Sequence, residues 1–403
     1  MKYLILIGDG MSDLPLKELN FKTPLETAKT PNMDFLAKNG MCGWVSNVPK
    51  DISPGSDVAA MSIFGYDPKK YYTGRGPLEA ASLGVKLKES DIAFRCNLVT
   101  IKDGLMESFT ADHISTEEAR KILTTLNQKM GHKGIRFYTG LSYRHLLVIN
   151  PTVGNFVENL PKLDCTPPHD ITGKKVELYL PQGPGEHLIK SLMKESIMHL
   201  LEHKVNITRI ENGKKPATMI WLWGQGKKPQ MQLFKKEYNK SAAVITAVHL
   251  LKGLGKIIGA EIPYVKGATG FIDTNYKGKA DAALKMIKRH DVVFVHVEAP
   301  DECGHMGDIK RKIKAIEDFD EKIVGYLLKS IKNRIKDFKI MVLPDHPTPI
   351  KLMTHTSDPV PFVIYNNVQN TGNKTITKYN EKELKKSKIK IDSGHKLLKK
   401  FFQ

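Results

Sequence analysis

Short apolar runs of strand length alternate with amphipathic segments along both ends of the chain. Residues 2–8, 291–297 and 339–343 are such runs, and each is followed by polar residues. Apolar runs of this length are typical of strands buried on both faces of a parallel sheet. Segments with helical spacing lie between them, so an α/β fold is expected, with helices covering both faces of a parallel sheet. The helices expected in this part of the chain are residues 32–39, 242–251, 280–289 and 309–330.

The middle of the chain has a different pattern. Residues 92–148 contain several alternating, strand-like segments, and Ser115 with Glu118 forms a capping box before an amphipathic helix. A chain of 403 residues also exceeds the size at which a single core stops growing. The sequence therefore predicts a discontinuous catalytic domain, residues 1–75 and 217–403, interrupted by a smaller inserted α+β domain, residues 76–216.

Composition narrows the class of protein. A hydrophobic content of 41% fits a folded globular chain, and no apolar run reaches the length of a membrane span. The four cysteines lack CxxC spacing, which favours reduced thiols and a cytoplasmic location. The net charge of +19 comes from lysines spread along the whole length, without a nucleic-acid-binding motif. We interpret the charge as a solvated lysine-rich surface, with the attraction of a small phosphorylated substrate as a secondary benefit. No nucleic acid and no membrane partner are expected, and the oligomeric state is left open.

Potential metal ligands follow each of the three apolar runs. Asp9 ends the first run, Asp301 and His305 follow the second, and Asp345 with His346 follows the third. The carboxyl ends of parallel strands meet at one edge of a sheet, which is where ligands bind in open α/β folds. A mixed Asp/His set suits Mn²⁺ or Zn²⁺ better than Ca²⁺. The sequence thus predicts a two-metal centre of the kind used for phosphoryl displacement.

Ser56 is the candidate nucleophile. It lies in the segment SPGSD at an expected helix start, where free amides favour a phosphate group. A simpler interpretation is that the Ser56 side chain only caps the helix. Likewise, Asp9-Gly10 taken alone is typical of a turn. The metal ligands around it favour the catalytic interpretation. His290 and His296 have no evident partners in the sequence and are interpreted as ordinary residues.

Several motifs together resemble one known family. The segments DGMSDLP, SPGSDVAAMSIFGYDP, YTGRGPLEAASLGV, VHVEAPDECGHMGD and LPDHPTPI, with HTSDPVPF after the last, are similar to the archaeal-type cofactor-independent phosphoglycerate mutases of the alkaline phosphatase superfamily. The similarity covers nearly the whole chain. It implies interconversion of 3-phosphoglycerate and 2-phosphoglycerate through a phosphoserine, without 2,3-bisphosphoglycerate.

The resemblance also implies roles for individual residues. Ser56 matches the phosphorylated serine, and two divalent metal ions are implied, with Mn²⁺ favoured and Zn²⁺, Co²⁺ or Mg²⁺ as alternatives. One ion would be held by Asp9, Ser56, Asp345 and His346, and the other by Asp301, His305 and His355. The inserted domain would bind the substrate and exclude water, and the candidates there are Arg75, Arg95, His113 and Arg144, with Lys227 as a further one.

Three other functions compete with this interpretation. A phosphatase or phosphodiesterase would use the same two-metal centre, and a related mutase would act on another substrate, such as a pentose phosphate. A basic nucleic-acid-binding protein would use the same Asp and His residues only structurally, and would show salt-sensitive DNA or RNA affinity.

Overall fold

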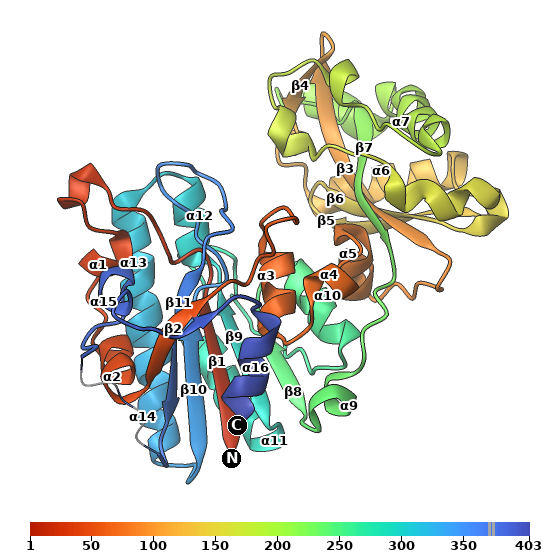
Figure 1. The fold of residues 1–403 in the computed structure, drawn as a ribbon. Coiled ribbons are helices and arrows are strands. Elements are labelled where there is room, and N and C mark those ends of the chain that lie inside the picture. Colours follow the sequence, from red (N-terminus) through yellow and green to blue (C-terminus); the bar gives the residue numbers. More distant parts are fainter. Residues whose placement is uncertain (370–371, 373–374) are drawn as a thin grey trace. The chain divides into compact units, whose positions relative to one another are not determined.

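The N-terminal apolar run forms β1 (Lys2–Gly8), an inner strand of a seven-stranded sheet. The computed structural model describes residues 1–369, 372 and 375–403, which form two units, Met1–Tyr72 with Met231–Gln403 and Thr73–Gln230. In the first unit β1 lies between β10 and β9, and both pairings are parallel although about 300 residues separate the partners in sequence (Figure 1). The predicted parallel sheet is confirmed.

The full strand order of this sheet is β12-β2-β11-β10-β1-β9-β8. The four strands from β10 to β8 are parallel, and β11 is antiparallel to both of its neighbours. The strands are β2 (Met41–Val45), β8 (Ala242–Ile245), β9 (Val292–Val297), β10 (Phe338–Leu343), β11 (Val360–Asn366) and β12 (Lys390–Ile391). The helices of this unit are α1 (Pro24–Thr27), α2 (Pro31–Asn39), α3 (Ser56–Ile63), α4 (Pro68–Tyr71), α9 (Phe234–Tyr238), α10 (His249–Ile257), α11 (Tyr276–Arg289), α12 (Ala299–His305), α13 (Ile309–Phe319), α14 (Tyr326–Lys332), α15 (Glu381–Leu384) and α16 (His395–Phe402).

Alternate residues of the buried strands face opposite layers of helices. Leu4 and Leu6 of β1 belong to the core that the sheet shares with α2, α11, α13 and α14. On the other face, Phe294 of β9 packs against Phe64 and Phe234, with ring centroids 4.5 and 6.0 Å apart. Because side chains alternate along a strand, a strand buried on both faces must be apolar throughout. This explains why the strands read as continuous hydrophobic runs.

Two of the predicted helices differ from the structure. The helix expected over residues 242–251 is wrong, because Ala242–Ile245 forms β8 and the helix, α10, begins at His249. The helix expected over 309–330 is α13 and α14, joined by a single π-helical stretch, Asp320–Gly325. Short apolar runs are ambiguous between strand and helix, which accounts for the first error.

The second unit is built on a five-stranded antiparallel sheet in which β3 pairs with β4, β6 and β7. The predicted boundary at residue 216 precedes β7, yet β7 pairs with β3, so the unit extends to Gln230. Ser115 and Glu118 form the predicted capping box. The elements are α5 (Arg75–Leu83), β3 (Ile92–Lys102), β4 (Leu105–Ser108), α6 (Thr116–Lys129), β5 (Ile135–Leu141), β6 (Arg144–Ile149), α7 (Glu186–Leu201), α8 (Lys204–Glu211) and β7 (Met219–Lys227).

A buried polar network ties loops of the first unit together. Lys312 of α13 is fully buried, and its Nζ lies 2.7 Å from Asp13 Oδ2. Glu381 accepts hydrogen bonds from Thr23 Oγ1 (2.7 Å) and from the amide of Asp13 (3.2 Å). Burial raises the pKa of Glu381 to about 7, although these hydrogen bonds oppose the shift. Burying a charged group away from water destabilises the fold unless the group is paired. The stability of this network therefore requires each charged group to have a partner.

The raised pKa of Glu381 makes stability depend on pH. Between pH 4.5 and 7 the folded chain holds a proton on Glu381 that the unfolded chain releases, so this group's contribution to stability falls as pH rises through that window. Glu381→Gln should remove that fall, which is on the order of 3 kcal/mol for a shift of this size. Urea unfolding of the wild type and of Glu381→Gln from pH 4.5 to 8 measures the free energy of unfolding. Parallel curves of this free energy against pH would contradict the raised pKa of Glu381.

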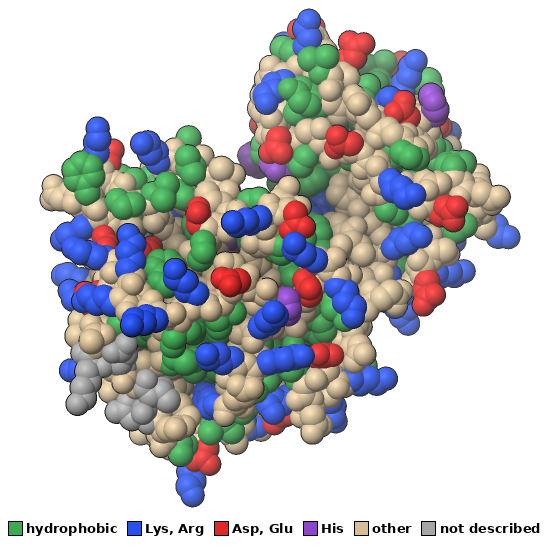
Figure 2. Space-filling model, in the orientation of Figure 1, with side chains coloured by type: hydrophobic (Ala, Val, Ile, Leu, Met, Phe, Trp, Pro, Cys, Tyr) green, Lys and Arg blue, Asp and Glu red, His purple; other side chains and the backbone are tan. Residues whose placement is uncertain are grey.

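The surface carries lysine and arginine side chains dispersed over both units on the visible face, without one dominant patch (Figure 2). This agrees with the interpretation of the charge as a solvated lysine-rich surface. Among the described residues, no helix combines the length and the apolar character needed to span a bilayer.

Candidate metal centre beside Ser56

Three neighbouring strands deliver acidic side chains to one edge of the sheet. Asp9 directly follows β1, Asp345 lies two residues beyond β10, and Asp301 lies in the first turn of α12 after β9. Because β10, β1 and β9 are adjacent and parallel, their carboxyl ends coincide. All three carboxylates are buried, at no more than 4% exposure. The predicted convergence of residues far apart in sequence is therefore present in the structure.

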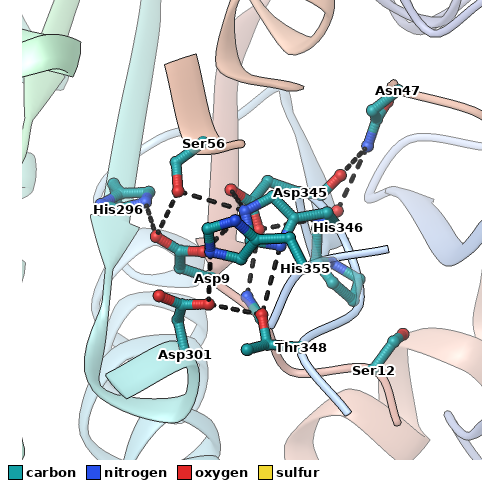
Figure 3. A network of polar contacts seen from close by, with 12 residues as sticks. Asp9, Ser12, Asn47, Ser56, His296, Asp301, Asp345, His346, Thr348 and His355 are labelled. Carbon is teal, nitrogen blue, oxygen red and sulfur yellow. Dashed lines mark hydrogen bonds and ion pairs between the residues drawn. The ribbon is translucent and has the colours of Figure 1, made fainter. Parts of the chain in front are cut away.

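Ser56 is the first residue of α3, and its hydroxyl points into this group (Figure 3). Its Oγ lies 3.3 Å from Asp9 Oδ2 and 3.1 Å from His346 Nε2. The N-cap position is Gly55, and among the described residues no side chain caps this helix. The simpler interpretation of Ser56 as a helix cap is thus wrong, since its oxygen faces the acidic group instead.

Asp9, Asp345 and His346 form the group nearest to Ser56. One ligand atom from each lies within 4.8 Å of the others. Asp345 Oδ1 accepts hydrogen bonds from the amides of Gly10 (3.1 Å) and His346 (2.8 Å). Asp9 Oδ1 and Asp345 Oδ2, by contrast, are buried without a hydrogen-bond partner among the described residues. Buried polar atoms are normally paired, and these two oxygens lie 3.6 and 3.3 Å from His346 Nε2, so the three atoms together fit a bound cation.

The electrostatics of this group also fit a cation. Burial raises the pKa of Asp9 well above its usual range, and repulsion from Asp345 and Asp301 adds to the shift. A positive ion between these carboxylates would relieve that repulsion. Burial lowers the pKa of His346, which keeps its imidazole neutral, the form that binds a metal.

Asp301, His346 and His355 offer ligand atoms within 4.8 Å of one another, so His346 belongs to both groups, and the predicted ligand His305 lies beside Asp301 and His355. Asp301 Oδ2 lies 3.3 Å from His305 Nε2, and Asp301 Oδ1 lies 3.4 Å from His355 Nε2. Burial acts to raise the pKa of Asp301, but hydrogen bonds from both histidines outweigh it and hold the pKa well below its usual range. The Nε2 atoms of His305 and His355 are 2.9 Å apart. Two ring nitrogens this close must share a proton or a cation, so this group also fits a metal ion.

A backbone contact orients His305. Its Nδ1 lies 3.0 Å from the carbonyl oxygen of Met353, which can only accept a hydrogen bond. Nδ1 therefore carries a proton, and Nε2 faces Asp301 and His355. A hydrogen bond of this kind on the far nitrogen is typical of histidines that ligate metals.

His296, interpreted from the sequence as an ordinary residue, belongs to the site. It is buried in β9, with Nε2 2.9 Å from Asp9 Oδ2 and Nδ1 3.3 Å from Thr246 Oγ1. Lys279, also buried, donates from Nζ to the His296 carbonyl at 3.1 Å. The available signal was a single polar residue in an otherwise apolar strand, VVFVHV. His290, by comparison, lies elsewhere and pairs with Glu261 at 2.7 Å.

The predicted substrate-binding arginines lie together in the second unit. Arg75 and Arg95 both face the ring of Trp223, with guanidinium carbons 5.6 and 4.4 Å from its centroid. Arg95 is buried and paired with Glu79 at 3.1 Å. Burial lowers the pKa of Arg95, and the charge of Glu79 opposes this shift. The nearby charges of Arg75 and then Arg144 lower the pKa further. The other two candidates lie on different segments: His113 is exposed in a turn with left-handed backbone (φ 52°), and Lys227 ends β7.

Comparisons with known proteins match the whole chain. A family model described as 2,3-bisphosphoglycerate-independent phosphoglycerate mutase matches residues 37–206. A protein of that name from Methanosarcina barkeri (strain Fusaro) is 50% identical over 398 residues, which cover 99% of this chain and 98% of that protein. The structure of the PH0037 protein from Pyrococcus horikoshii has a TM-score of 0.82 at 31% identity, covering 100% of this chain and 96% of that one. The cofactor-independent phosphoglycerate mutase from Thermoplasma acidophilum has a TM-score of 0.65 at 27% identity, with both chains fully covered.

Proposed function

Because the chain belongs to the family of 2,3-bisphosphoglycerate-independent phosphoglycerate mutases, we propose that it interconverts 3-phosphoglycerate and 2-phosphoglycerate through a phosphorylated Ser56. As a member of this family it is an enzyme of the isomerase class. Without 2,3-bisphosphoglycerate, a group on the protein must hold the phosphoryl group between its two positions. The hydroxyl of Ser56, at the start of α3, lies beside Asp9 and His346.

One observation carries this proposal. Asp9 Oδ1 and Asp345 Oδ2 are buried and without hydrogen-bond partners among the described residues, and they share a group with His346, whose Nε2 contacts the Ser56 hydroxyl. Asp9, Ser56, Asp345 and His346 would hold one divalent cation, and Asp301, His305 and His355 a second; Mn²⁺ suits these mixed ligands. When bound, such ions would neutralise the charge of the phosphoryl group and favour ionisation of the serine hydroxyl.

The residues around Ser56 provide for the first half of the reaction. The Ser56 Oγ attacks phosphorus, its proton passes to Asp9 Oδ2, and the bond from phosphorus to the substrate oxygen breaks. Ser56 begins α3, so the free amides of the first helical turn favour the negative charge of the phosphoryl group. The leaving alkoxide of the glycerate takes up one proton as it departs. The other hydroxyl of glycerate releases one when it attacks in the second half, and Asp9 returns the serine proton, so the cycle balances.

The second half reverses these steps with the other hydroxyl of glycerate. That hydroxyl attacks the phosphorus of phosphoserine, and the Ser56 oxygen regains a proton as its bond to phosphorus breaks. Water must be kept away, because its attack would release phosphate. The same centre open to water would make a phosphatase, which is therefore the main competing function.

The arginines of the second unit are proposed to recognise the substrate. Arg75 and Arg144 are partly exposed, and guanidinium groups bind carboxylate and phosphate in a bidentate manner. Arg95 is buried against Glu79, which neutralises its charge. Arg95 is thus better suited to holding Trp223 in place than to binding an anion itself.

Incubation with 3-phosphoglycerate tests the function. With Mn²⁺ and without 2,3-bisphosphoglycerate, the protein should form 2-phosphoglycerate, detected by coupling to enolase, and little free phosphate. Release of phosphate without 2-phosphoglycerate would instead establish a phosphatase. Failure to convert 3-phosphoglycerate, with conversion of another phosphorylated sugar such as a pentose phosphate, would establish a mutase of different specificity.

A further inference from the structure

Thr348 contacts both candidate metal groups with one hydroxyl. It is fully buried and lies two residues after His346, in the loop that follows β10. Its Oγ1 donates a short hydrogen bond to Asp301 Oδ1 and lies 3.3 Å from His346 Nδ1 (Figure 3). Asp301 belongs to one group of ligands, and His346, which offers a ligand atom to both groups, faces Ser56. The hydroxyl of Thr348 is therefore a direct bridge between them.

The directions of these two hydrogen bonds follow from the chemistry of a hydroxyl. A threonine has one proton to donate, and a carboxylate oxygen can only accept, so the proton of Thr348 goes to Asp301. The contact with His346 must then be a bond that Thr348 accepts, which requires a proton on His346 Nδ1. The neutral His346 ring consequently has no proton on Nε2, the atom 3.1 Å from Ser56 Oγ.

The backbone around Thr348 holds this hydroxyl in place. The Thr348 carbonyl accepts a hydrogen bond from Lys312 Nζ at 2.8 Å, and the same ammonium binds Asp13 and the Ser12 carbonyl. The amide of Thr348 donates to the Ser12 carbonyl at 3.3 Å. Gly10 has φ +62°, and a Cβ there would approach Thr348 Oγ1 to 2.6 Å. The segment therefore has little freedom to move the hydroxyl away from either partner.

We propose that Thr348 is a positioning residue that sets the tautomer of His346 and the orientation of Asp301 at the same time, so that both metal groups depend on one hydroxyl. The inference rests on the proposed function and extends it to a residue that touches no reacting atom. Second-shell hydrogen bonds of this kind orient ligands and change metal affinity by about 10- to 100-fold when they are removed. A merely structural threonine would alter unfolding temperature without altering metal affinity.

Two substitutions separate these possibilities. Thr348→Val keeps the shape and removes the hydroxyl, whereas Thr348→Ser keeps the hydroxyl. Calorimetric titration of metal-free protein with Mn²⁺ should give two binding steps for the wild type. In Thr348→Val the Mn²⁺ affinity of both steps should fall at least about 10-fold. In Thr348→Ser both affinities should stay within about threefold of those of the wild type. Unchanged affinities in Thr348→Val, or a loss at one step alone, would overturn the inference.

A second measurement does not depend on metal. Nitrogen-15 NMR of the histidine rings in the metal-free wild type should show His346 protonated on Nδ1, and protonation on Nε2 instead would overturn the inference even if Thr348→Val failed to fold.

The proposed metal centre and the proposed role of Thr348 are contradicted by different results. A wild-type protein that binds no Mn²⁺ would overturn the proposed metal centre together with the role of Thr348, whereas normal binding in both Thr348 variants would overturn only the latter.

Discussion

Replacement of Ser56 by alanine should lower the rate of isomerisation at least about 10⁴-fold, because the variant has no oxygen to hold the phosphoryl group. The loss should appear in kcat as well as in kcat/KM, since the missing group takes part in bond formation and not only in binding. Among the described residues the Ser56 hydroxyl caps no helix. The substitution therefore removes no capping hydrogen bond from α3. The enolase-coupled assay measures the rate, and thermal unfolding reports the fold.

Ser53 provides a matched control for this substitution. It lies three residues upstream in the same loop, and its side chain is exposed. Ser53→Ala should retain activity within about twofold, as is usual for surface positions away from structural features. Isomerisation by Ser56→Ala at more than about one hundredth of the wild-type rate would contradict the role of Ser56 as nucleophile.

Removal of divalent metal should have an effect of similar size on activity. Asp9, Asp301 and Asp345 are buried together, and repulsion among them contributes to the raised pKa of Asp9. Exhaustive chelation should therefore abolish isomerisation and lower the unfolding temperature, and Mn²⁺ should restore both. A ligand at 100 times its Kd stabilises the folded state by about 2.7 kcal/mol, which sets the scale of the expected change. Activity that survives complete removal of metal would contradict the two-metal centre.

Asp345→Asn gives this test an internal control. The amide removes one negative charge next to Asp9, so the metal-free variant should be more stable than the metal-free wild type. The same change should weaken Mn²⁺ binding, because a neutral amide is a poorer ligand than a carboxylate. Opposite effects of one substitution on stability and on metal affinity would identify charge repulsion as the reason for the cation's binding. A metal-free variant less stable than the metal-free wild type would contradict this explanation.

The parallel sheet could be predicted because its strands are buried on both faces. Residues 3–8 and 340–343 read as unbroken apolar runs, and an acidic residue follows each within two positions. Their convergence followed from topology alone. The position of β7 could not be predicted in this way, because MIWLWGQGK also reads as a buried strand and nothing in it indicates pairing with β3 and not with the parallel sheet. The prediction missed strand β8 because the segment AAVI is too short to distinguish from the start of a helix.

The residues that support the site were harder to predict than those that face it. His296 and Thr348 were not singled out as site residues, although they lie in the motifs VHVEAPDECGHMGD and LPDHPTPI that contain the predicted ligands. Their importance lies in contacts with Asp9 and Asp301, which come from other strands. The local pattern around Ser56 favoured a helix cap, and the direction of its hydroxyl became clear only from the fold. Spatial contacts between distant segments are the information that a single sequence lacks.

The central claim is that side chains from α3, α12 and the loops after β1 and β10 surround two cations next to the Ser56 hydroxyl. Anomalous scattering from crystals grown with Mn²⁺ tests it most directly, because it locates the ions independently of activity. The account predicts two peaks, each about 2.2 Å from its ligands: one bound by Asp9, Ser56, Asp345 and His346, and the other by Asp301, His305 and His355. The absence of peaks at this edge of the sheet, or peaks bound only by other residues, would contradict it.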